Sequence, residues 1–231
     1  NLALQSEDFS NASWVKGNVT VTANDITAPD GTLTADKCAA TTTTFTSITQ
    51  NITVTGDASS YTYSVYVKKG SGATEGNSFI FRNGTTGVNM VICTFNYDTG
   101  VTGIASARSE DVGNEWWRLS LTVLTGVKSG NVLVLYCGFT GGSVAAGVYA
   151  YFWGAQLVQA NYPGPYAPTT TTAVNTGAIR SIAPNQNLQL YSDAQSLAEY
   201  VSDSGVTVAA YTWTGLSFLA YATSFGDNSA T

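Results

Sequence analysis

The sequence predicts an all-β fold, an antiparallel β-sandwich followed by a small C-terminal segment. Only 10% of the 231 residues are charged, whereas 44% are hydrophobic and 12% are aromatic. This composition is typical of a chain with a packed core and excludes disordered and salt-bridged helical proteins. Short segments rich in Val, Ile, Thr, Tyr and Phe recur along the first two thirds of the chain, separated by Gly, Asn, Asp and Pro. Short strands at this spacing favour a sandwich.

Eight segments have the composition of strands. They cover residues 18–22, 47–54, 61–68, 78–82, 88–96, 116–123, 132–139 and 148–158. Turn-forming residues separate several of them, as in Pro29-Asp30-Gly31, Asn83-Gly84 and Asp98-Thr99-Gly100. Residues 131–137 are almost continuously apolar, which indicates a strand buried on both faces.

The composition changes near residue 162. Residues 162–172 contain three of the five prolines and a run of threonines, which is typical of an extended linker. We therefore expect a sandwich over 1–168, a Thr/Pro-rich tether over 169–180 and a small C-terminal segment over 181–231. In the last of these, a capping pattern at Ser192 predicts one short helix, and residues 206–225 predict a hairpin with its turn at Thr214-Gly215.

Residues 205–225 contain no charged side chain. Thr, Ser and Gly interrupt this stretch, so strands or a subunit interface explain it better than a membrane span, and no membrane insertion is expected. We expect this part to attach or oligomerise the chain, with a trimer favoured. The expected assembly residues are Tyr211, Trp213, Leu216, Phe218 and Leu219.

Composition also excludes several chemistries. The chain has no histidine, which excludes Ser-His-Asp and Cys-His catalysis and His-ligated metals. Its net charge of -6 and nine dispersed basic residues argue against a nucleic-acid partner. Cys38, Cys93 and Cys137 are widely spaced, which favours reduced, buried thiols. No signal peptide pattern is visible at the start of the sequence.

Alternation along three strands predicts one outward face with aromatic and hydrogen-bonding side chains. An aromatic ring stacks on the apolar side of a pyranose and polar groups bind its hydroxyls, so such a face suits a glycan. It equally suits a protein partner, since Tyr, Trp and Arg anchor protein interfaces. A purely structural role at the core edge is the third interpretation. The expected binding residues are Tyr66, Lys68, Trp116, Arg118, Phe152 and Gln156.

Five segments form an ordered series over residues 1–170. They are NLALQSEDFSNASW (1–14) continued by APDGTLTADK (28–37), YTYSVYVK (61–68), WWRLSL (116–121), WGAQL (153–157) and YAPTT (166–170). This series resembles a family of bacteriophage virion proteins: tail-fibre, receptor-binding and head-decoration modules with a carbohydrate-binding-module-like jelly roll. The resemblance implies a jelly-roll sandwich located on the virion. The chain departs from the family at Val158, where an acidic residue is usual.

The resemblance also implies a possible structural calcium, because related carbohydrate-binding modules often hold one near the N-terminal segment. Ca²⁺ takes six to eight oxygen ligands, and Glu7, Asp8 and Asp30 are weak candidates for supplying some of them. The alternative is that Asp30 serves its turn and that Glu7 and Asp8 are solvated acids. No metal or other cofactor is otherwise expected.

Three functional hypotheses follow. The first is a non-enzymatic structural protein of a phage particle (fibre, tail adhesin or capsid decoration), assembled in the host cytoplasm with other virion proteins as partners. The second is recognition of a host surface glycan through the aromatic and Arg face. The third is a polysaccharide-degrading enzyme or its accessory module, which is disfavoured because the acidic groups Glu7-Asp8 and Glu110-Asp111-Glu115 fall in expected loops and turns.

Overall fold

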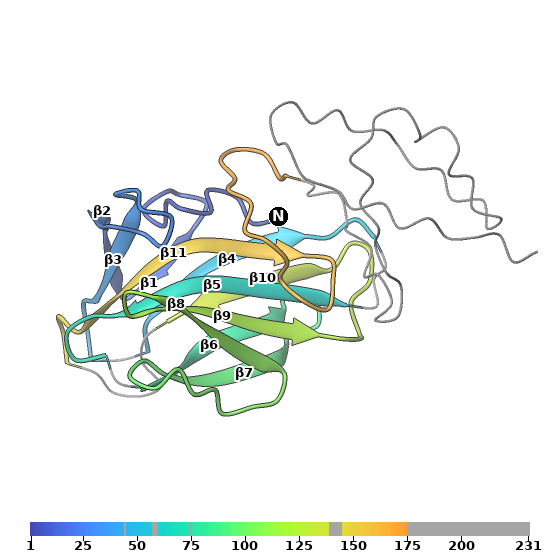
Figure 1. Cartoon of the computed structure of the whole chain (residues 1–231). Coiled ribbons are helices and arrows are strands. Elements are labelled where there is room, and N and C mark those ends of the chain that lie inside the picture. Colours follow the sequence, from blue (N-terminus) through green and yellow to red (C-terminus); the bar gives the residue numbers. More distant parts are fainter. Residues whose placement is uncertain (44, 57–59, 74, 139–144, 175–231) are drawn as a thin grey trace, which may run out of the picture. The chain divides into compact units, whose positions relative to one another are not determined.

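The structure is a computed structural model that describes residues 1–43, 45–56, 60–73, 75–138 and 145–174. This part of the chain contains strands and no helix, arranged as two antiparallel sheets in a jelly-roll-like sandwich (Figure 1). The predicted all-β sandwich is confirmed. The strands are β1 Val15–Gly17, β2 Val19–Ile26, β3 Ala35–Ala40, β4 Ser47–Thr53, β5 Tyr61–Lys69, β6 Glu75–Asn83, β7 Val88–Asn96, β8 Ala107–Gly113, β9 Trp116–Val123, β10 Val132–Cys137 and β11 Tyr149–Val158.

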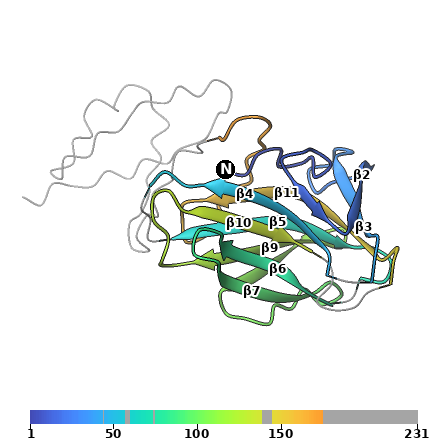
Figure 2. The same ribbon diagram turned by 180° about the vertical axis from the view of Figure 1, so that it is seen from behind.

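The two sheets lie against each other as layers, which Figures 1 and 2 show from opposite sides. The five-stranded sheet has the order β1-β4-β10-β6-β7, and the six-stranded sheet has the order β2-β3-β11-β5-β9-β8. Strand β11 pairs with β3 on one side and with β5 on the other. The last strand of the sandwich therefore lies between β3, from the start of the chain, and β5, from further along it.

The core lies between the two sheets, because alternate residues of each strand point inward. Large apolar side chains from both sheets are fully buried there, and each contributes roughly 1.5–3 kcal/mol on burial. Two aromatic rings from opposite sheets, Phe79 of β6 and Phe152 of β11, meet edge to face at 6.1 Å between ring centroids. The core residues include Phe79, Phe81, Leu133 and Leu135 of the five-stranded sheet and Tyr63, Leu119, Leu121 and Leu157 of the six-stranded sheet.

All three cysteines are free and buried, which confirms the interpretation drawn from their spacing. The Sγ atom of Cys137 lies 2.6 Å from the hydroxyl oxygen of Tyr63 in the core. Burial raises the pKa of Cys137 to about 12 and that of Cys93 to about 11. These thiols stay protonated at neutral pH, so they act as packing groups rather than as nucleophiles.

Strands β3 and β8 lie outside the segments predicted from composition. The sequences Ala-Asp-Lys-Cys-Ala-Ala and Ala-Arg-Ser-Glu-Asp-Val-Gly are poor in β-branched residues, and charges interrupt both. Pairing supplies the missing stability: on β8, Glu110 lies opposite Arg118 of β9. The expectation that Glu110 and Asp111 lie in a loop or turn is therefore wrong, since both belong to β8.

Residues 1–6 and 166–174 are joined by hydrogen bonds and are called the terminal clasp below. The Asn1 side chain is 4% exposed; its amide nitrogen donates to the carbonyls of Ala155 (3.0 Å) and Ala167 (2.8 Å). The Thr169 N–H donates to Ser6 Oγ at 2.8 Å. Further along, the Val174 N–H donates to the Asn1 carbonyl at 3.0 Å. Residues 169–174, which were expected to begin a tether, are held against the N-terminal segment.

The described residues up to Val174 belong to one unit, called the first unit below, whose bounds are Asn1–Gly177. The boundary expected after residue 168 therefore falls inside the first unit. The expected helix at 192–201 and hairpin at 206–225 lie outside the described residues.

Candidate binding groove on the six-stranded sheet

Alternation along β5 and β9 follows the sequence-based expectation. The odd-numbered residues from Tyr61 to Val67 and from Trp117 to Val123 lie in or against the core. The even-numbered residues of both strands lie on the outer face of the six-stranded sheet, where Lys68 is the cross-strand partner of Trp116.

Alternation along β11 departs from the expectation. Phe152 is fully buried in the core, so the prediction that it faces outward is wrong. The cause is a register shift between Trp153 and Gln156, centred on Gly154, which has a φ of +62°. A bulge of this kind reverses the side on which the following residues lie. Phe152 before the bulge and Leu157 after it both face inward, although they have opposite parity.

The aromatic side chains expected to form an open binding face are covered. Trp116 is 2% exposed, Trp153 is 3% exposed and Tyr66 is 9% exposed. They form a second apolar cluster on the outer side of the sheet, with ring centroids of Tyr66 and Trp153 separated by 5.1 Å. The other residues of this cluster are Ala28 and Ala35, with Tyr166 packed against them.

Arg118 and Gln156 hold the segment that runs across this cluster. The Arg118 guanidinium donates to the Gly164 carbonyl at 2.7 Å, and the Gln156 amide donates to the Pro163 and Pro165 carbonyls. Arg118 Nε is buried and has no hydrogen-bond partner. Both side chains therefore bind the chain's own backbone and are not free for a ligand.

A shallow groove remains beside the covered cluster. Its volume is about 340 Å³. Two of the expected binding residues, Lys68 and Trp116, line it, whereas Tyr66, Arg118, Phe152 and Gln156 do not. The lining residues are Ile26, Thr27, Ala28, Lys68, Asn114, Trp116 and Tyr151.

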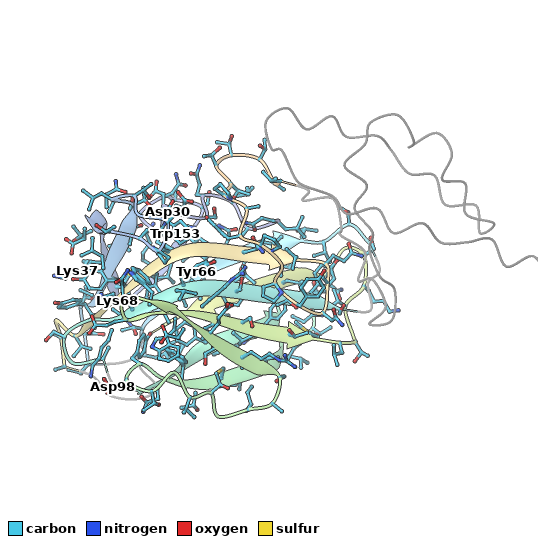
Figure 3. All side chains as sticks on the ribbon, in the orientation of Figure 1. Asp30, Lys37, Tyr66, Lys68, Asp98 and Trp153 are labelled. Carbon is cyan, nitrogen blue, oxygen red and sulfur yellow. The ribbon has the colours of Figure 1, made fainter. Side chains whose placement is uncertain are left out.

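The groove lies along a cross-strand row in which basic and aromatic side chains alternate. Lys37 pairs with Tyr151, Tyr151 pairs with Lys68, and Lys68 pairs with Trp116. Figure 3 shows Lys37 and Lys68 over the six-stranded sheet, with Tyr66 and Trp153 further along it. The row therefore offers a hydrogen-bond donor beside each aromatic ring.

Neighbouring groups interact with the ammonium and hydroxyl groups of this row. The Lys68 ammonium lies 3.1 Å from a Glu115 carboxylate oxygen and donates to the Asn114 carbonyl at 2.7 Å. The Lys37 ammonium lies 4.1 Å from the ring centroid of Tyr149, a cation–π contact. Burial first, and then its neighbour Tyr149, raises the pKa of Tyr151 to about 12. Tyr151 therefore stays a neutral hydroxyl donor and acceptor at physiological pH.

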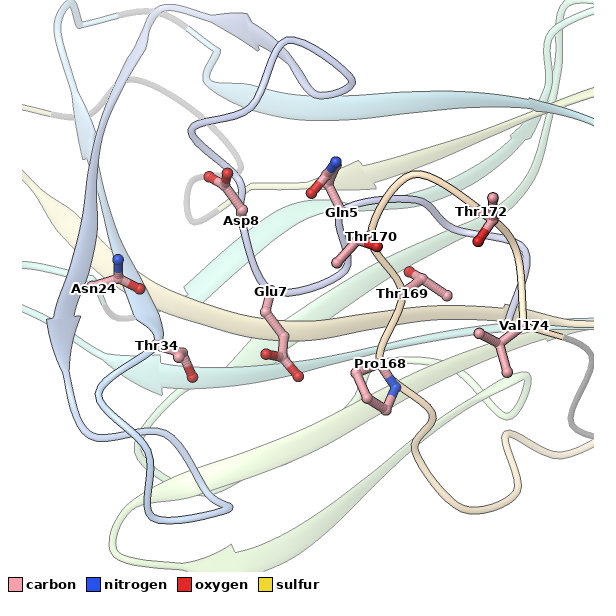
Figure 4. Close-up of a pocket in the computed structure, with 10 residues that line it drawn as sticks. All are labelled: Gln5, Glu7, Asp8, Asn24, Thr34, Pro168, Thr169, Thr170, Thr172 and Val174. Atoms are coloured by element: carbon pink, nitrogen blue, oxygen red, sulfur yellow. The ribbon is translucent and has the colours of Figure 1, made fainter.

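A second cleft, of about 420 Å³, lies beside the terminal clasp (Figure 4). Glu7 lines it and accepts a hydrogen bond from the Tyr166 hydroxyl at 3.0 Å. Burial raises the pKa of Glu7, the Tyr166 bond opposes this, and Asp30 adds to it. The lining residues are Gln5, Glu7, Asp8, Asn24, Thr34, Pro168, Thr169, Thr170, Thr172 and Val174.

The calcium candidates do not converge on one point. Asp8 Oδ1 accepts hydrogen bonds from the backbone N–H groups of Ser10 and Asn11, and Asp30 Oδ1 accepts from the Thr32 N–H at 2.9 Å. Both therefore act as turn residues, the alternative weighed for Asp30. Over the described ranges, no three His, Cys, Asp or Glu side chains are grouped as metal ligands. The residues present do not fit the calcium site that the family resemblance implies.

Sequence reasoning missed Asn114 and Tyr151 as groove residues and Lys37 as a member of the adjoining cross-strand row. Lys37 lies on the unpredicted strand β3. Strict alternation along β11, which would place Phe152 outward, would place its neighbour Tyr151 inward, because such alternation does not include the bulge at Gly154. The isolated Gly154 inside a strand pattern is the signal that could have indicated a bulge.

Two further expectations concern the assembly residues and a membrane span. The assembly residues Tyr211, Trp213, Leu216, Phe218 and Leu219 lie outside the described residues. Within the described residues, no helix has the length and apolar character needed to cross a bilayer.

Comparisons with known proteins give distant likenesses. No family model and no curated protein matches the chain. The CBM22-1 xylan-binding domain of Xyn10C from Paenibacillus barcinonensis is 15% identical, with a TM-score of 0.40 over 67% of this chain and 90% of that domain. The enzymatically active domain of tailspike protein 4 of bacteriophage CBA120 is 17% identical, with a TM-score of 0.41 over 66% of this chain and 20% of that one.

Proposed function

We propose that the chain is a non-enzymatic structural module of a bacteriophage particle, with its sandwich displayed at the particle surface. One observation carries the proposal: the segments that resemble phage virion proteins are the ones that build the terminal clasp and the six-stranded sheet. Residues 1–14 and 166–170 bind each other through Asn1, Ser6 and Thr169. The resemblance therefore covers one coherent folding unit rather than scattered short matches.

The proposal gives the part beyond residue 177 the role of attachment. Its uncharged stretch at 205–225 favours contacts with other virion proteins or with further copies of the chain, in a trimer. The fibre, a tail adhesin and a capsid decoration are all compatible positions for such a module.

Particle membership can be tested directly. Antibodies against the full chain should label intact, purified particles of the phage that encodes it, and mass spectrometry should detect its peptides at a fixed ratio to known capsid proteins. Its absence from purified particles would contradict the proposal. Release of reducing ends from host capsule by the purified chain would contradict the non-enzymatic part alone.

A second candidate function is recognition of a host surface glycan in the groove beside Trp116. The cross-strand row Lys37, Tyr151 and Lys68 favours it, because the partly exposed Tyr151 ring lies between two hydrogen-bond donors, which is what sugar recognition needs. Trp116, which is 2% exposed, supports the groove from its buried side.

The glycan proposal makes a specific forecast for variants. The Lys68→Ala/Tyr151→Ala chain should lose glycan-array signal about 10-fold or more, since it removes two ligand contacts worth roughly 1 kcal/mol or more. Tyr162→Ala, which removes a tyrosine that is 41% exposed and does not line the groove, should leave the signal unchanged. Equal binding by both variants would refute this site.

A further inference from the structure

The outer face of the five-stranded sheet combines exposed apolar side chains with uncharged polar ones, such as Thr49, Asn51 and Thr53 of β4. One row of cross-strand partners runs across all five strands and is called the outer row: Val15, Thr49, Tyr136, Ile80 and Ile92. Val15 is 64% exposed and Ile92 is 49% exposed. None of the five belongs to the apolar cores or packs against them. The strands β4, β10, β6 and β7 that carry most of this row can be followed in Figure 2.

Three of the five strands of this sheet carry no charged residue. Strands β4, β7 and β10 contain no Asp, Glu, Lys or Arg. Arg82 of β6 pairs with Val134, a buried residue that also belongs to neither core, so it lies on the outer side. The guanidinium of Arg82 turns toward the β6–β7 turn, where a Cβ on Gly87 would lie 3.7 Å from Nη2. The outer row itself is therefore free of charged side chains.

Within the part of the chain that the structure describes, one edge of this sheet is unpaired over part of its length. The segment 101–103 pairs with the end of β7, where the Gly103 N–H donates to the Thr94 carbonyl at 2.9 Å. Among the described residues, no strand pairs with the outer edge of β7 at residues 88–92. A long uncharged edge beside a face with exposed apolar side chains favours association between chains.

We propose that this face is an interface between two copies of the chain. Copies carry a net charge of -6 each and repel one another, and an uncharged surface lets them meet without like-charge contacts. In a two-fold dimer a face meets itself. The apolar side chains of the outer row can pack against the same side chains of a second copy. Thr49 and Tyr136 can also face a second copy, because each hydroxyl can both donate and accept a hydrogen bond.

The size of the face sets the strength of the contact. Five strands about 4.8 Å apart span about 20 Å, and strands of six to nine residues span about 20–30 Å. Two such faces bury about 800–1,200 Å² in total, which is at the lower end of the range for specific interfaces. The dimer is therefore weak and concentration-dependent.

The test is sedimentation of the full chain over a dilution series, with two charge-matched double variants. Thr49→Lys/Ile92→Lys places two ammonium groups in the outer row. Leu33→Lys/Leu124→Lys makes the same change in net charge at two leucines that are each 62% exposed and lie outside the five-stranded sheet. Circular dichroism and thermal unfolding check that both variants keep the fold.

The wild type and the Leu33/Leu124 variant should double in mass reversibly as concentration rises. The Thr49/Ile92 variant should need at least about 10-fold higher concentration for the same step. Amide exchange in peptides covering 88–96 should slow with concentration in the first two chains only. Two outcomes would overturn the proposal: a wild type that never shows the mass step, or a Thr49/Ile92 variant that associates as the control does. Copies would then associate through another face, or the outer row would bind another protein.

Discussion

Gly154 determines which side chains of β11 face the core. Its φ of +62° lies in the left-handed region, and a Cβ at this position would lie 2.9 Å from Cδ2 of the Tyr66 ring. The residue therefore needs both a conformation that L side chains rarely adopt and the space of a missing side chain. The bulge, and with it the placement of Phe152 and Leu157 on the same inward face, depends on this glycine.

Gly154→Ala should reduce the free energy of unfolding by about 2–4 kcal/mol, because backbone strain and a clash with a buried ring add. Gly126→Ala is the matched control: Gly126 has a φ of +86°, but nothing lies within 4 Å of its Cβ position. The control should cost only about 1–2 kcal/mol of backbone strain. Urea unfolding of both variants measures the difference, and equal costs would contradict the role of the Tyr66 contact.

Asp36 is a fully buried carboxylate that ties the N-terminal segment to strands β2 and β3. One oxygen accepts from the Phe9 N–H at 2.7 Å and the other from the Asn24 N–H at 2.9 Å. Burial raises its pKa from 3.8 to about 6, more than these hydrogen bonds lower it. The folded state therefore binds the proton of Asp36 more tightly than the unfolded state does.

The sign of the pH effect follows from this raised pKa. The contribution of Asp36 to stability is fully present below about pH 4 and is lost as the pH rises through about 6. Asp36→Asn removes this dependence. The wild type should therefore gain about 2–3 kcal/mol relative to the variant when the pH falls from about 7.5 to about 4.

Denaturant unfolding of the wild type and the Asp36→Asn variant at both pH values measures this change. A constant difference between the two chains is expected on top of it, because the amide has one oxygen for two N–H donors. If that difference did not change with pH, Asp36 would not titrate in the folded state over this range.

Among the elements, the terminal clasp closes the sandwich at a place where no strand pairing does so. Ser6 accepts from the Thr169 N–H, and the Gln5 N–H donates to the Thr170 carbonyl at 2.8 Å. These bonds join residues more than 160 positions apart, so they form only when the rest of the sandwich is in place. The clasp should therefore add stability to the whole first unit.

Two truncations test the clasp. A chain ending at Gly177 keeps residues 169–174, and it should unfold in one step with a free energy close to that of the first unit in the full chain. A chain ending at Pro168 lacks Thr169 and Thr170, so the backbone N–H groups of Gln5 and Ser6 lose their acceptors. Its free energy of unfolding should fall by about 2–4 kcal/mol. Thermal and urea unfolding compare the two chains. Equal stability would mean that residues 169–174 are the dispensable tether predicted from composition.

The strands that could be predicted from the sequence are those whose pattern is local. The predicted segments 88–96 and 116–123 coincide with β7 and β9, because β-branched and aromatic residues fill them. β3 and β8 could not be predicted in this way, because pairing with β11 and β9 stabilises them and their own composition does not.

The candidate site was predictable only in part, for the same reason. Alternation placed Lys68 and Trp116 on the outer face of their strands, and both line the groove. It could not show that the segment 163–167 crosses the outer face and engages Arg118 and Gln156. The segment that covers this face lies more than 40 positions after Arg118 in the sequence, and a pattern within one strand does not reveal such a contact.

For the whole molecule, charge is divided unevenly between the two parts of the chain. Residues 1–168 carry 8 basic and 11 acidic side chains, and residues 169–231 carry 1 and 4, so each part has a net charge of -3. The smaller part is more acidic per residue, but residues 205–225 carry no charge. Copies that repel through the rest of their surfaces can still meet through this stretch.

Assembly through the C-terminal part and dimerisation through the outer row can be separated by one deletion. If residues 205–225 hold copies together, a chain ending at Gly177 should lose the concentration-independent oligomer of the full chain and keep only the weak dimer. Adding Thr49→Lys/Ile92→Lys to that shorter chain should then give a monomer. Light scattering after gel filtration measures the mass in each case, and an oligomer that survives the deletion unchanged would exclude residues 178–231 as the assembly element.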